Sequence, residues 1–188
     1  AGVSITDSTD FDLQALTLTA NLEVESGGSI TQSGNLTIGG TSSFTTSDKT
    51  ITLNNSSLTN AFSGAVALTT TGSSAHVYID NGTTALQITN GSSVRGNLTL
   101  VSGHLSGITD AGSLTVGGNL SATTDDNNGV ISLGGLVVEG TIALATNDDA
   151  NNDSATALVV NNCSICSGGV GLNFAASTVE GNLTATAT

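Results

Sequence analysis

Short segments in which apolar and polar residues alternate run along this chain from one end to the other. In Leu16–Leu18, Ile51–Leu53 and Leu98–Leu100, two aliphatic residues flank a Thr. Alternation with a period of two places the aliphatic side chains on one face of a β-strand and the polar ones on the other. We therefore predict strands at Val3–Thr6, Leu16–Thr19, Leu36–Ile38, Ile51–Leu53, Val66–Leu68, Val77–Ile79, Leu86–Ile88, Leu98–Leu100, Leu114–Val116, Val130–Leu133, Ile142–Leu144, Leu158–Val160 and Leu172–Phe174.

The spacing of these strands favours a parallel β-helix over antiparallel hairpins. Helical apolar spacing is nearly absent, so the fold class is all-β. The strands are very short, and the pairs Gly39-Gly40, Gly117-Gly118, Gly134-Gly135 and Gly168-Gly169 are predicted to form corners that tolerate positive φ. A rung of roughly 20 residues with three strands gives about nine rungs. The complete lack of proline fits, because nearly every strand of a solenoid donates its N–H groups to neighbours.

One four-residue phrase, Gly-Asn-Leu-Thr, recurs along the chain. It is found at Gly34–Thr37, Gly96–Thr99, Gly118–Ser121 and Gly181–Thr184, and in degraded form at Ala20–Glu23. Repetition at this density indicates that a small unit is stacked many times. We interpret the unit as a corner followed by a strand, in which Gly turns, Asn stacks on its equivalents, Leu enters the core and Thr faces outward.

Longer repeats are also visible. Residues 30–40 match residues 108–118 at an offset of 78 (108 − 30), whereas Asn21 and Asn97 are 76 apart (97 − 21) and Asn97 and Asn182 are 85 apart (182 − 97). Unequal offsets are expected when loops gain or lose residues while the strands keep register. We predict one solenoid domain over residues 1–188, with two long repeats at roughly 21–96 and 97–181 and partial repeats at both ends.

Composition limits both the core and the partners. Aromatic residues are 3% of the 188 residues, so the interior should be a narrow stack of Ala, Val, Leu and Ile. The net charge is −13, and Lys49 and Arg95 are the two basic residues, which argues against nucleic-acid binding and against docking on an anionic membrane. No apolar run approaches the roughly 20 residues of a membrane span, and no signal peptide begins the sequence. We therefore expect that the protein neither binds nucleic acid nor inserts into a membrane.

Three stretches carry a resemblance to a known family. Ser29–Thr41, Ile51–Asn55 followed by Ala61–Leu68, and Ser177–Thr184 resemble the repeats of filamentous-haemagglutinin-like exoproteins, the bacterial surface proteins of two-partner secretion. The resemblance covers essentially the whole chain and implies a right-handed parallel β-helix that is secreted to the cell surface. The secretion domain of such proteins has an Asn-Pro motif, which a chain without proline lacks, so the resemblance is to the shaft alone.

Cys163 and Cys166 form the one chemically unusual motif. An extracellular protein favours a local disulfide between them. Free or intermolecular thiols are an alternative, and a redox or zinc role is a third. A thioredoxin-type motif requires a βαβ context, and a zinc site requires a second ligand pair, which the separate His76 and His104 do not supply.

Oxygen-rich loops offer weak candidates for calcium binding. They match neither the EF-hand pattern nor the Gly-Gly-x-Gly-x-Asp nonapeptide, so solvated acidic loops are the competing interpretation and no cofactor is predicted. No catalytic residue set is found either. Enzymes on β-helices that act on polysaccharides use acids with Arg, Lys and aromatic groups, and one Tyr, Tyr78, is present, so we expect no enzyme. The calcium candidates are Asp125, Asp126, Asp148, Asp149 and Asp153.

The leading functional expectation is structural. The chain is expected to be an extracellular segment of a surface fibre, sheath or adhesin stalk, because its repeats reach both ends without capping features. Its expected partners are copies of itself or adjoining repeats stacked end to end, with glycans or a host or neighbouring cell surface beyond them. A second class is a glycan- or ice-binding module that uses Thr and Ser ladders, and a polysaccharide-acting enzyme is the third. The second class is motivated by the pairs Thr17/Thr19, Thr50/Thr52, Thr69/Thr71 and Thr184/Thr186.

Overall fold

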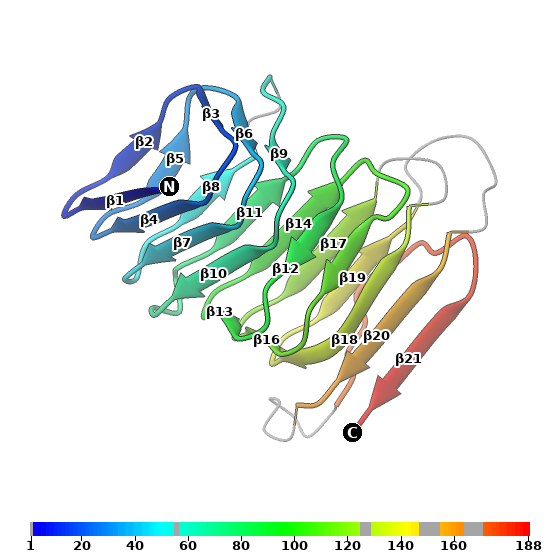
Figure 1. Ribbon diagram of the computed structural model, residues 1–188. Helices are drawn as coiled ribbons and strands as arrows, with labels where there is room; N and C mark the ends of the chain where they lie inside the picture. Colours follow the sequence, from blue (N-terminus) through cyan, green and yellow to red (C-terminus); the bar gives the residue numbers. More distant parts are fainter. Residues whose placement is uncertain (1, 55–56, 125–128, 147–154, 164–170) are drawn as a thin grey trace.

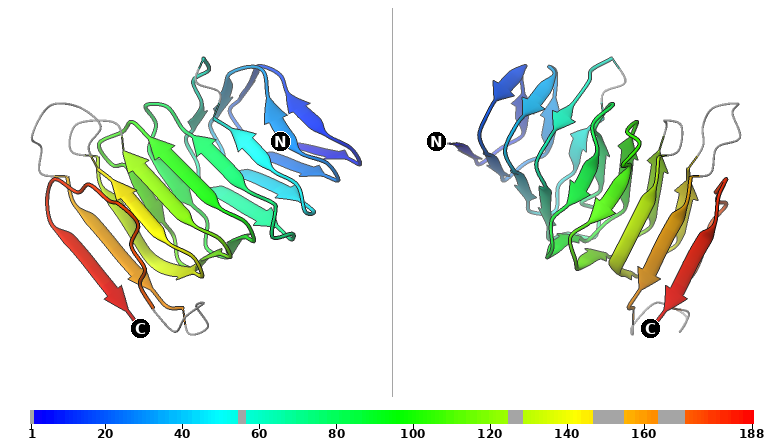
Figure 2. Two further views of the ribbon diagram at one scale, coloured as in Figure 1. Left: turned by 180° about the vertical axis from the view of Figure 1, so that it is seen from behind. Right: turned by 45° about the vertical axis from the view of Figure 1, so that its right-hand side comes forward.

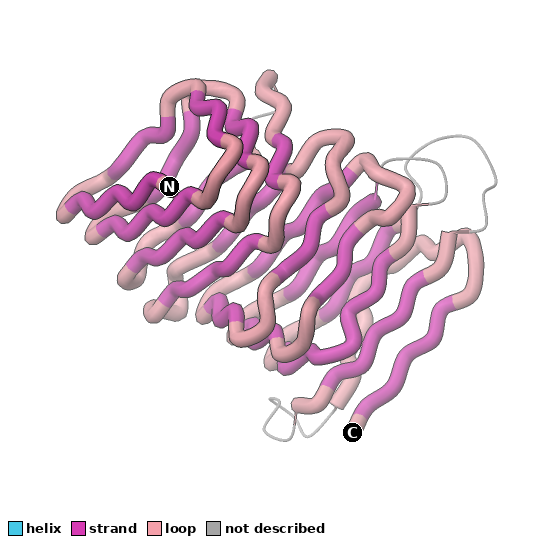
Figure 3. The backbone as a smooth tube through the Cα atoms, viewed as in Figure 1, coloured by secondary structure: helices cyan, strands magenta, loops and turns pink. Residues whose placement is uncertain are grey.

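The fold is known from a computed structural model that describes residues 2–54, 57–124, 129–146, 155–163 and 171–188. These residues form strands, turns and loops but no helix, which confirms the all-β prediction (Figure 3). It follows that no apolar helix long enough to cross a membrane is found in this described part.

All strand pairings of the described residues are parallel, and they build three sheets, which we call A, B and C (Figure 1). Sheet A contains β1 (Val3–Asp7), β4 (Leu22–Ser26), β7 (Ser42–Thr46), β10 (Val66–Thr70), β12 (Leu86–Ile88), β13 (Ser92–Val94), β15 (Ile108–Asp110), β16 (Leu114–Val116), β18 (Ile131–Val138), β20 (Ala157–Asn161) and β21 (Leu183–Ala187). Sheet B contains β2 (Phe11–Leu13), β5 (Ile30–Gln32), β8 (Ile51–Leu53), β11 (Val77–Asp80), β14 (Leu98–Ser102), β17 (Leu120–Thr124) and β19 (Ile142–Ala145). Sheet C contains β3 (Leu16–Leu18), β6 (Leu36–Ile38) and β9 (Ala61–Phe62).

The chain winds through these sheets as a right-handed β-solenoid of about seven turns (Figure 1 and Figure 2). The prediction of nine rungs was too high because most turns are longer than the rung length assumed from the sequence. The first turn is short, with Val3 paired to Leu22, but a later turn carries the chain from Ile131 to Ala157 before the strands pair again. The extra residues lie in sequence between the described strands, as expected when insertions are confined to loops.

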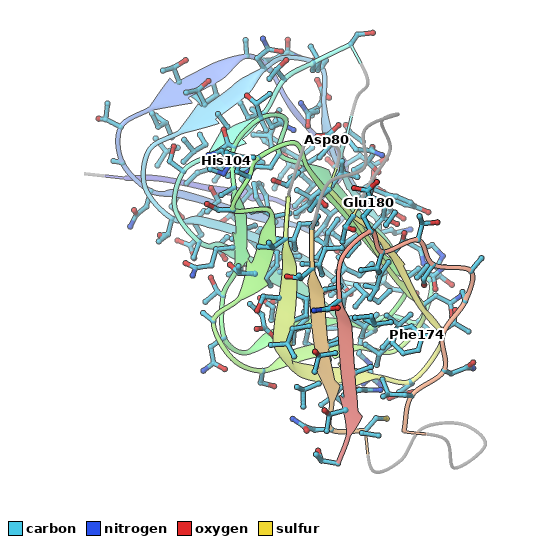
Figure 4. The ribbon with its side chains drawn as sticks, turned by 90° about the vertical axis from the view of Figure 1, so that its right-hand side faces the viewer. Asp80, His104, Phe174 and Glu180 are labelled. Carbon is cyan, nitrogen blue, oxygen red and sulfur yellow. The ribbon has the colours of Figure 1, made fainter. Side chains whose placement is uncertain are left out.

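Every strand predicted from alternation lies on an observed strand except Leu172–Phe174. Phe174 makes only an isolated bridge to Ile142, and its side chain is 36% exposed at the C-terminal end of the stack (Figure 4). Alternation missed strands such as β7 because its inward positions include the polar Ser42 and Thr46 as well as Phe44. β7 tolerates polar residues at inward positions because it is hydrogen-bonded to β4 on one side and to β10 on the other, and these pairings hold it as a strand.

The cross-section changes about a third of the way along the stack. Sheet C accompanies only the first three turns, and β10 then pairs with both β12 and β13 of the following turn. Further on, the single strand β18 spans the places of β15 and β16. The solenoid is therefore continuous in its sheets but not uniform in shape.

The core is a set of columns of inward aliphatic side chains. In sheet B, for example, Leu98, Leu120 and Ile142 follow one another in register, and each is at most 1% exposed. Phe44 and Phe62 are the large exceptions and meet edge to face, with ring centroids 5.7 Å apart. Stacking of like residues in successive turns fills this narrow interior without bulky aromatic clusters.

Candidate functional site

The Asn residues of the repeated phrase connect successive turns. Asn21 Oδ1 accepts the backbone N–H of Thr41 at 3.0 Å. In the later turns, Asn97 Oδ1 accepts the N–H of Asn119, and Asn119 Oδ1 accepts the N–H of Thr141, both at 2.9 Å. Each bond satisfies a corner N–H that the strand ladders do not reach. Asn therefore follows Asn in successive turns at 97 and 119, as interpreted, whereas Asn21 is followed by Thr41; in each case the partner is the backbone of the next turn.

A Gly one turn after Asn97 and one turn after Asn119 makes room for each of these side chains. A Cβ atom on Gly118 would lie 2.3 Å from Asn97 Oδ1, and one on Gly140 would lie 2.4 Å from Asn119 Oδ1. The predicted reason for the glycines was wrong for Gly39-Gly40 and Gly117-Gly118, because none of these residues has positive φ. Gly134-Gly135 lies inside β18 rather than at a corner, and Gly168-Gly169 lies outside the described residues. Close approach between turns, not a left-handed backbone, requires Gly one turn after these Asn residues.

Copies of the phrase occupy all three sheets. Leu22 and Leu183 begin strands of sheet A, Leu36 begins a strand of sheet C, and Leu98 and Leu120 begin strands of sheet B. The phrase therefore marks one corner with the strand that follows, not one complete turn. The long repeats at roughly 21–96 and 97–181 stay a prediction.

His76 takes the place of an Asn in one of these rows. Its Nδ1 accepts the backbone N–H of Asn97 at 2.9 Å, so His76, Asn97, Asn119 and Thr141 form one continuous row of side chain-to-backbone bonds. Sequence reasoning treated this histidine as isolated. The sequence does contain a sign of this role: His76 stands directly before the strand that begins at Val77, just as Asn97 and Asn119 stand directly before strands. His104 instead accepts the N–H of Ser106 within its own loop, at 3.0 Å.

A buried polar network lies at the corner that follows sheet B. Asn81 is fully buried, and its Oδ1 accepts the N–H of Phe62 at 2.7 Å. Its Nδ2 donates to the carbonyl oxygens of Phe62, Thr84 and Ala85 at 2.9–3.2 Å. One turn earlier, Asn60 and Gln32 bond to each other through both amide groups. These amides replace missing backbone pairs inside the solenoid.

Inward hydroxyl groups continue this corner in later turns. Ser102 donates to the Thr84 carbonyl at 3.0 Å, and Thr124 donates to the Gly129 carbonyl at 2.8 Å. Both residues are fully buried. Sequence reasoning missed them because a Thr at an inward position resembles the outward Thr residues of the alternation.

A different set of hydroxyl groups faces outward from sheet B. Thr52, Tyr78, Thr99 and Ser121 are in direct register on β8, β11, β14 and β17, and each is partly exposed. We call these four residues the hydroxyl column. None of their hydroxyl groups forms a hydrogen bond with the rest of the described chain.

The Thr pairs that motivated an ice-binding array do not share one surface. Thr17 lies in sheet C, Thr52 in sheet B, and Thr69 and Thr184 in distant strands of sheet A. Ice recognition requires one flat, unbroken array, which these four pairs do not provide.

Several predicted site residues fall in parts of the chain that are not described. Asp125, Asp126, Asp148, Asp149 and Asp153 lie there, so calcium binding stays a prediction. Cys163 is 6% exposed, but Cys166 also lies outside the described residues, and the disulfide remains a prediction as well. In the residues that are described, neither a pocket nor a cluster of three potential metal ligands is found.

The parallel sheets and the rows of corner side chains define a repeat protein of the β-solenoid class. A family model described as "Repeats of unknown function (DUF5649)" matches residues 1–69. This region covers the three turns that include sheet C and almost all of β10. No curated protein and no solved structure matches the chain.

Proposed function

We propose that this chain is a segment of a non-enzymatic structural shaft on the outside of the cell, in a protein of the filamentous-haemagglutinin-like kind. The repeat resemblance supports the family, and the continuous stack of parallel strands supports the mechanical role. A net charge of −13 with only two basic residues supports a shaft that stays soluble and avoids nucleic acid. No cofactor has a role in this proposal.

The observation that carries the proposal is the hydrogen-bonding edge at each end of sheet A. Thr188 N donates to Asn161 O and Ala157 N donates to Asn182 O, which fixes the alternation along β21. The N–H groups of Leu183, Ala185 and Ala187 consequently point away from β20. Such an edge is a template for another strand. In this proposal the next strand comes from adjoining repeats or from a second copy stacked end to end.

A proline variant tests end-to-end stacking directly. The N–H of Ala185 faces the open edge, so Ala185→Pro removes a donor for the next strand while the donors to β20 remain. The matched control is Thr186→Ala, which keeps every backbone N–H of β21. Sedimentation velocity and electron microscopy of residues 1–188 over a range of concentrations should show rods that lengthen for wild type and control but not for Ala185→Pro. A wild-type protein that stays monomeric at the highest concentration would rule out end-to-end stacking.

The cellular location needs its own measurement. Antibodies raised against residues 1–188 should label intact cells of the source organism, and immunogold particles should follow thin surface structures. Labelling that requires permeabilised cells would overturn the surface role, whatever the purified protein does in solution.

A further inference from the structure

We propose that the hydroxyl column of sheet B binds an extended, neutral polysaccharide that lies along the solenoid axis. This binding site goes beyond the structural role and does not depend on end-to-end stacking. It is carried by the register of four side chains, by their unused hydrogen-bonding groups, and by the charge of their surroundings.

The register places one hydroxyl group on each of four successive turns. Thr52 pairs with Tyr78, Tyr78 with Thr99, and Thr99 with Ser121, all without a shift. Neighbouring strands are about 4.8 Å apart, so the hydroxyl groups form a straight row with that spacing. This distance is close to the length of one sugar residue in an extended glucan. A chain along the axis can therefore meet one hydroxyl group per sugar.

The inward and outward hydroxyl groups of this sheet differ in their bonding. The buried hydroxyls of Ser102 and Thr124 each donate to a backbone carbonyl oxygen. The four hydroxyls of the column have no such partner among the described residues, and each can both donate and accept. A sugar hydroxyl has the same dual capacity, so it can replace the water that occupies this row.

Tyr78 and Asp80 add the two groups that orient a sugar. They are two residues apart on β11 and therefore face the same side of the sheet. The Tyr78 ring offers an apolar surface for the C–H face of a pyranose, with a polar group at its tip. Asp80 Oδ1 accepts the N–H of Gly82 at 2.8 Å, while Oδ2 has no partner in the described chain and can accept from a sugar hydroxyl (Figure 4).

The charge pattern selects a neutral partner. Beyond Asp80, the outward residues of the last four strands of sheet B are uncharged: Tyr78, Thr99, Val101, Ser121, Thr123, Ala143 and Ala145. The protein as a whole carries a net charge of −13, which repels polyuronates and sulfated glycans. None of these outward strand positions is basic, so they offer an anionic chain no compensating attraction.

Isosteric variants test the column. Affinity electrophoresis through gels with hydroxyethyl cellulose, a neutral linear glucan, gives the dissociation constant. Thr99→Val removes one hydroxyl group and should weaken binding about threefold to tenfold, as expected for one net hydrogen bond. Tyr78→Ala should weaken it at least as much. The matched control is Thr45→Val, because Thr45 is also partly exposed and faces outward, but from β7 of sheet A; this variant should bind like wild type.

Three outcomes would overturn the proposal: wild type that is not retarded by the neutral glucan, retardation by polygalacturonate of equal strength, or equal weakening by Thr99→Val and Thr45→Val. Far-UV circular dichroism and thermal melting establish that each variant is folded. Rod formation by Thr99→Val should match wild type, since the end edges are unchanged. A failure of glucan binding is thus distinguishable from a failure of the structural proposal.

Discussion

Replacing Asn81 should be among the most damaging single changes in this solenoid. Its side chain is fully buried, its Oδ1 accepts the Phe62 N–H, and its Nδ2 bonds to three carbonyl oxygens. Asn81→Ala leaves the buried N–H and carbonyl oxygen of Phe62 without this partner, whereas the Thr84 carbonyl keeps its bond from Ser102. A buried group that loses its partner costs about 1–3 kcal/mol. One acceptor and two donor hydrogens are lost, and we expect a decrease of about 3–5 kcal/mol in the free energy of unfolding.

Asn119→Ala is the matched comparison. Asn119 also bridges two turns through its Oδ1, but it lies at an exposed corner, where water can replace the lost acceptor. The expected cost is therefore about 0.5–1.5 kcal/mol, as for one ordinary hydrogen bond. The difference between the two variants isolates the effect of burial from the effect of losing an Asn.

Urea unfolding followed by far-UV circular dichroism measures both changes. Repeat arrays can unfold in more than one step, so the urea dependence of each variant has to be compared with that of wild type. Amide hydrogen exchange at Phe62 provides a local readout, because its N–H is released only in Asn81→Ala. If Asn81→Ala costs less than about 1 kcal/mol, or no more than Asn119→Ala, then the buried amide is not a stabilising element and our reasoning is wrong.

Three further changes test separate features. Gly118→Ala should destabilise by about 1–3 kcal/mol in urea melts, since the new methyl group collides with Asn97 Oδ1 and with the Gly96 backbone. The double variant with Asn97→Ala should recover the part of the loss that is due to Asn97, and strictly additive effects would contradict this contact. Ser42→Ala should leave stability unchanged or raise it by up to about 1 kcal/mol, because the buried Ser42 hydroxyl has no partner in the described structure, and a clear loss in the same melts would point to a hidden one. The Thr9 N–H and hydroxyl hold the pKa of Asp7 below its usual value, so its stabilising effect is present above the unfolded-state pKa of about 3.9 and is lost as pH falls through the lower folded pKa. The difference in urea midpoint between wild type and Asp7→Ala should accordingly be larger at pH 6 than at low pH, and a constant difference would refute the assignment.

Alternation and repetition were enough to predict the fold class. The segments Leu36–Ile38, Ile51–Leu53 and Leu114–Val116 are strands with the predicted limits, because both flanking positions are aliphatic and point inward. The number of turns was less predictable. Corner length is set by loops that carry no periodic signal, so a single assumed rung length could not anticipate longer turns such as the one from Ile131 to Ala157.

The polar interior could not be predicted from the pattern alone. Asn81 and Asn119 look equivalent in sequence, since each lies at the end or the start of a strand beside a Gly. Only the stacking of turns shows that one faces the core and the other the solvent. The hydroxyl column was equally hidden: Thr52 and Thr99 are ordinary residues of the alternation until the register aligns them with Tyr78 and Ser121.

The fit between Asn97 and Gly118 has a consequence for how this protein can change over time. Asn21, Asn97 and Asn119 constrain their own positions and also exclude a side chain one turn further on, at Gly40, Gly118 and Gly140, where a methyl group would lie within 2.3–2.4 Å of the amide oxygen. A corner of this kind can therefore lose its Asn at the cost of one exposed hydrogen bond, but it can gain one only where the next turn already has Gly. Substitutions at positions paired in this way, as 97 is with 118, are predicted to co-vary in related chains, and in a fixed order: glycine first, asparagine second. Duplication of whole turns is not limited in this way, because it copies the Asn and the matching Gly together. Such a solenoid is therefore expected to lengthen by duplication of existing turns.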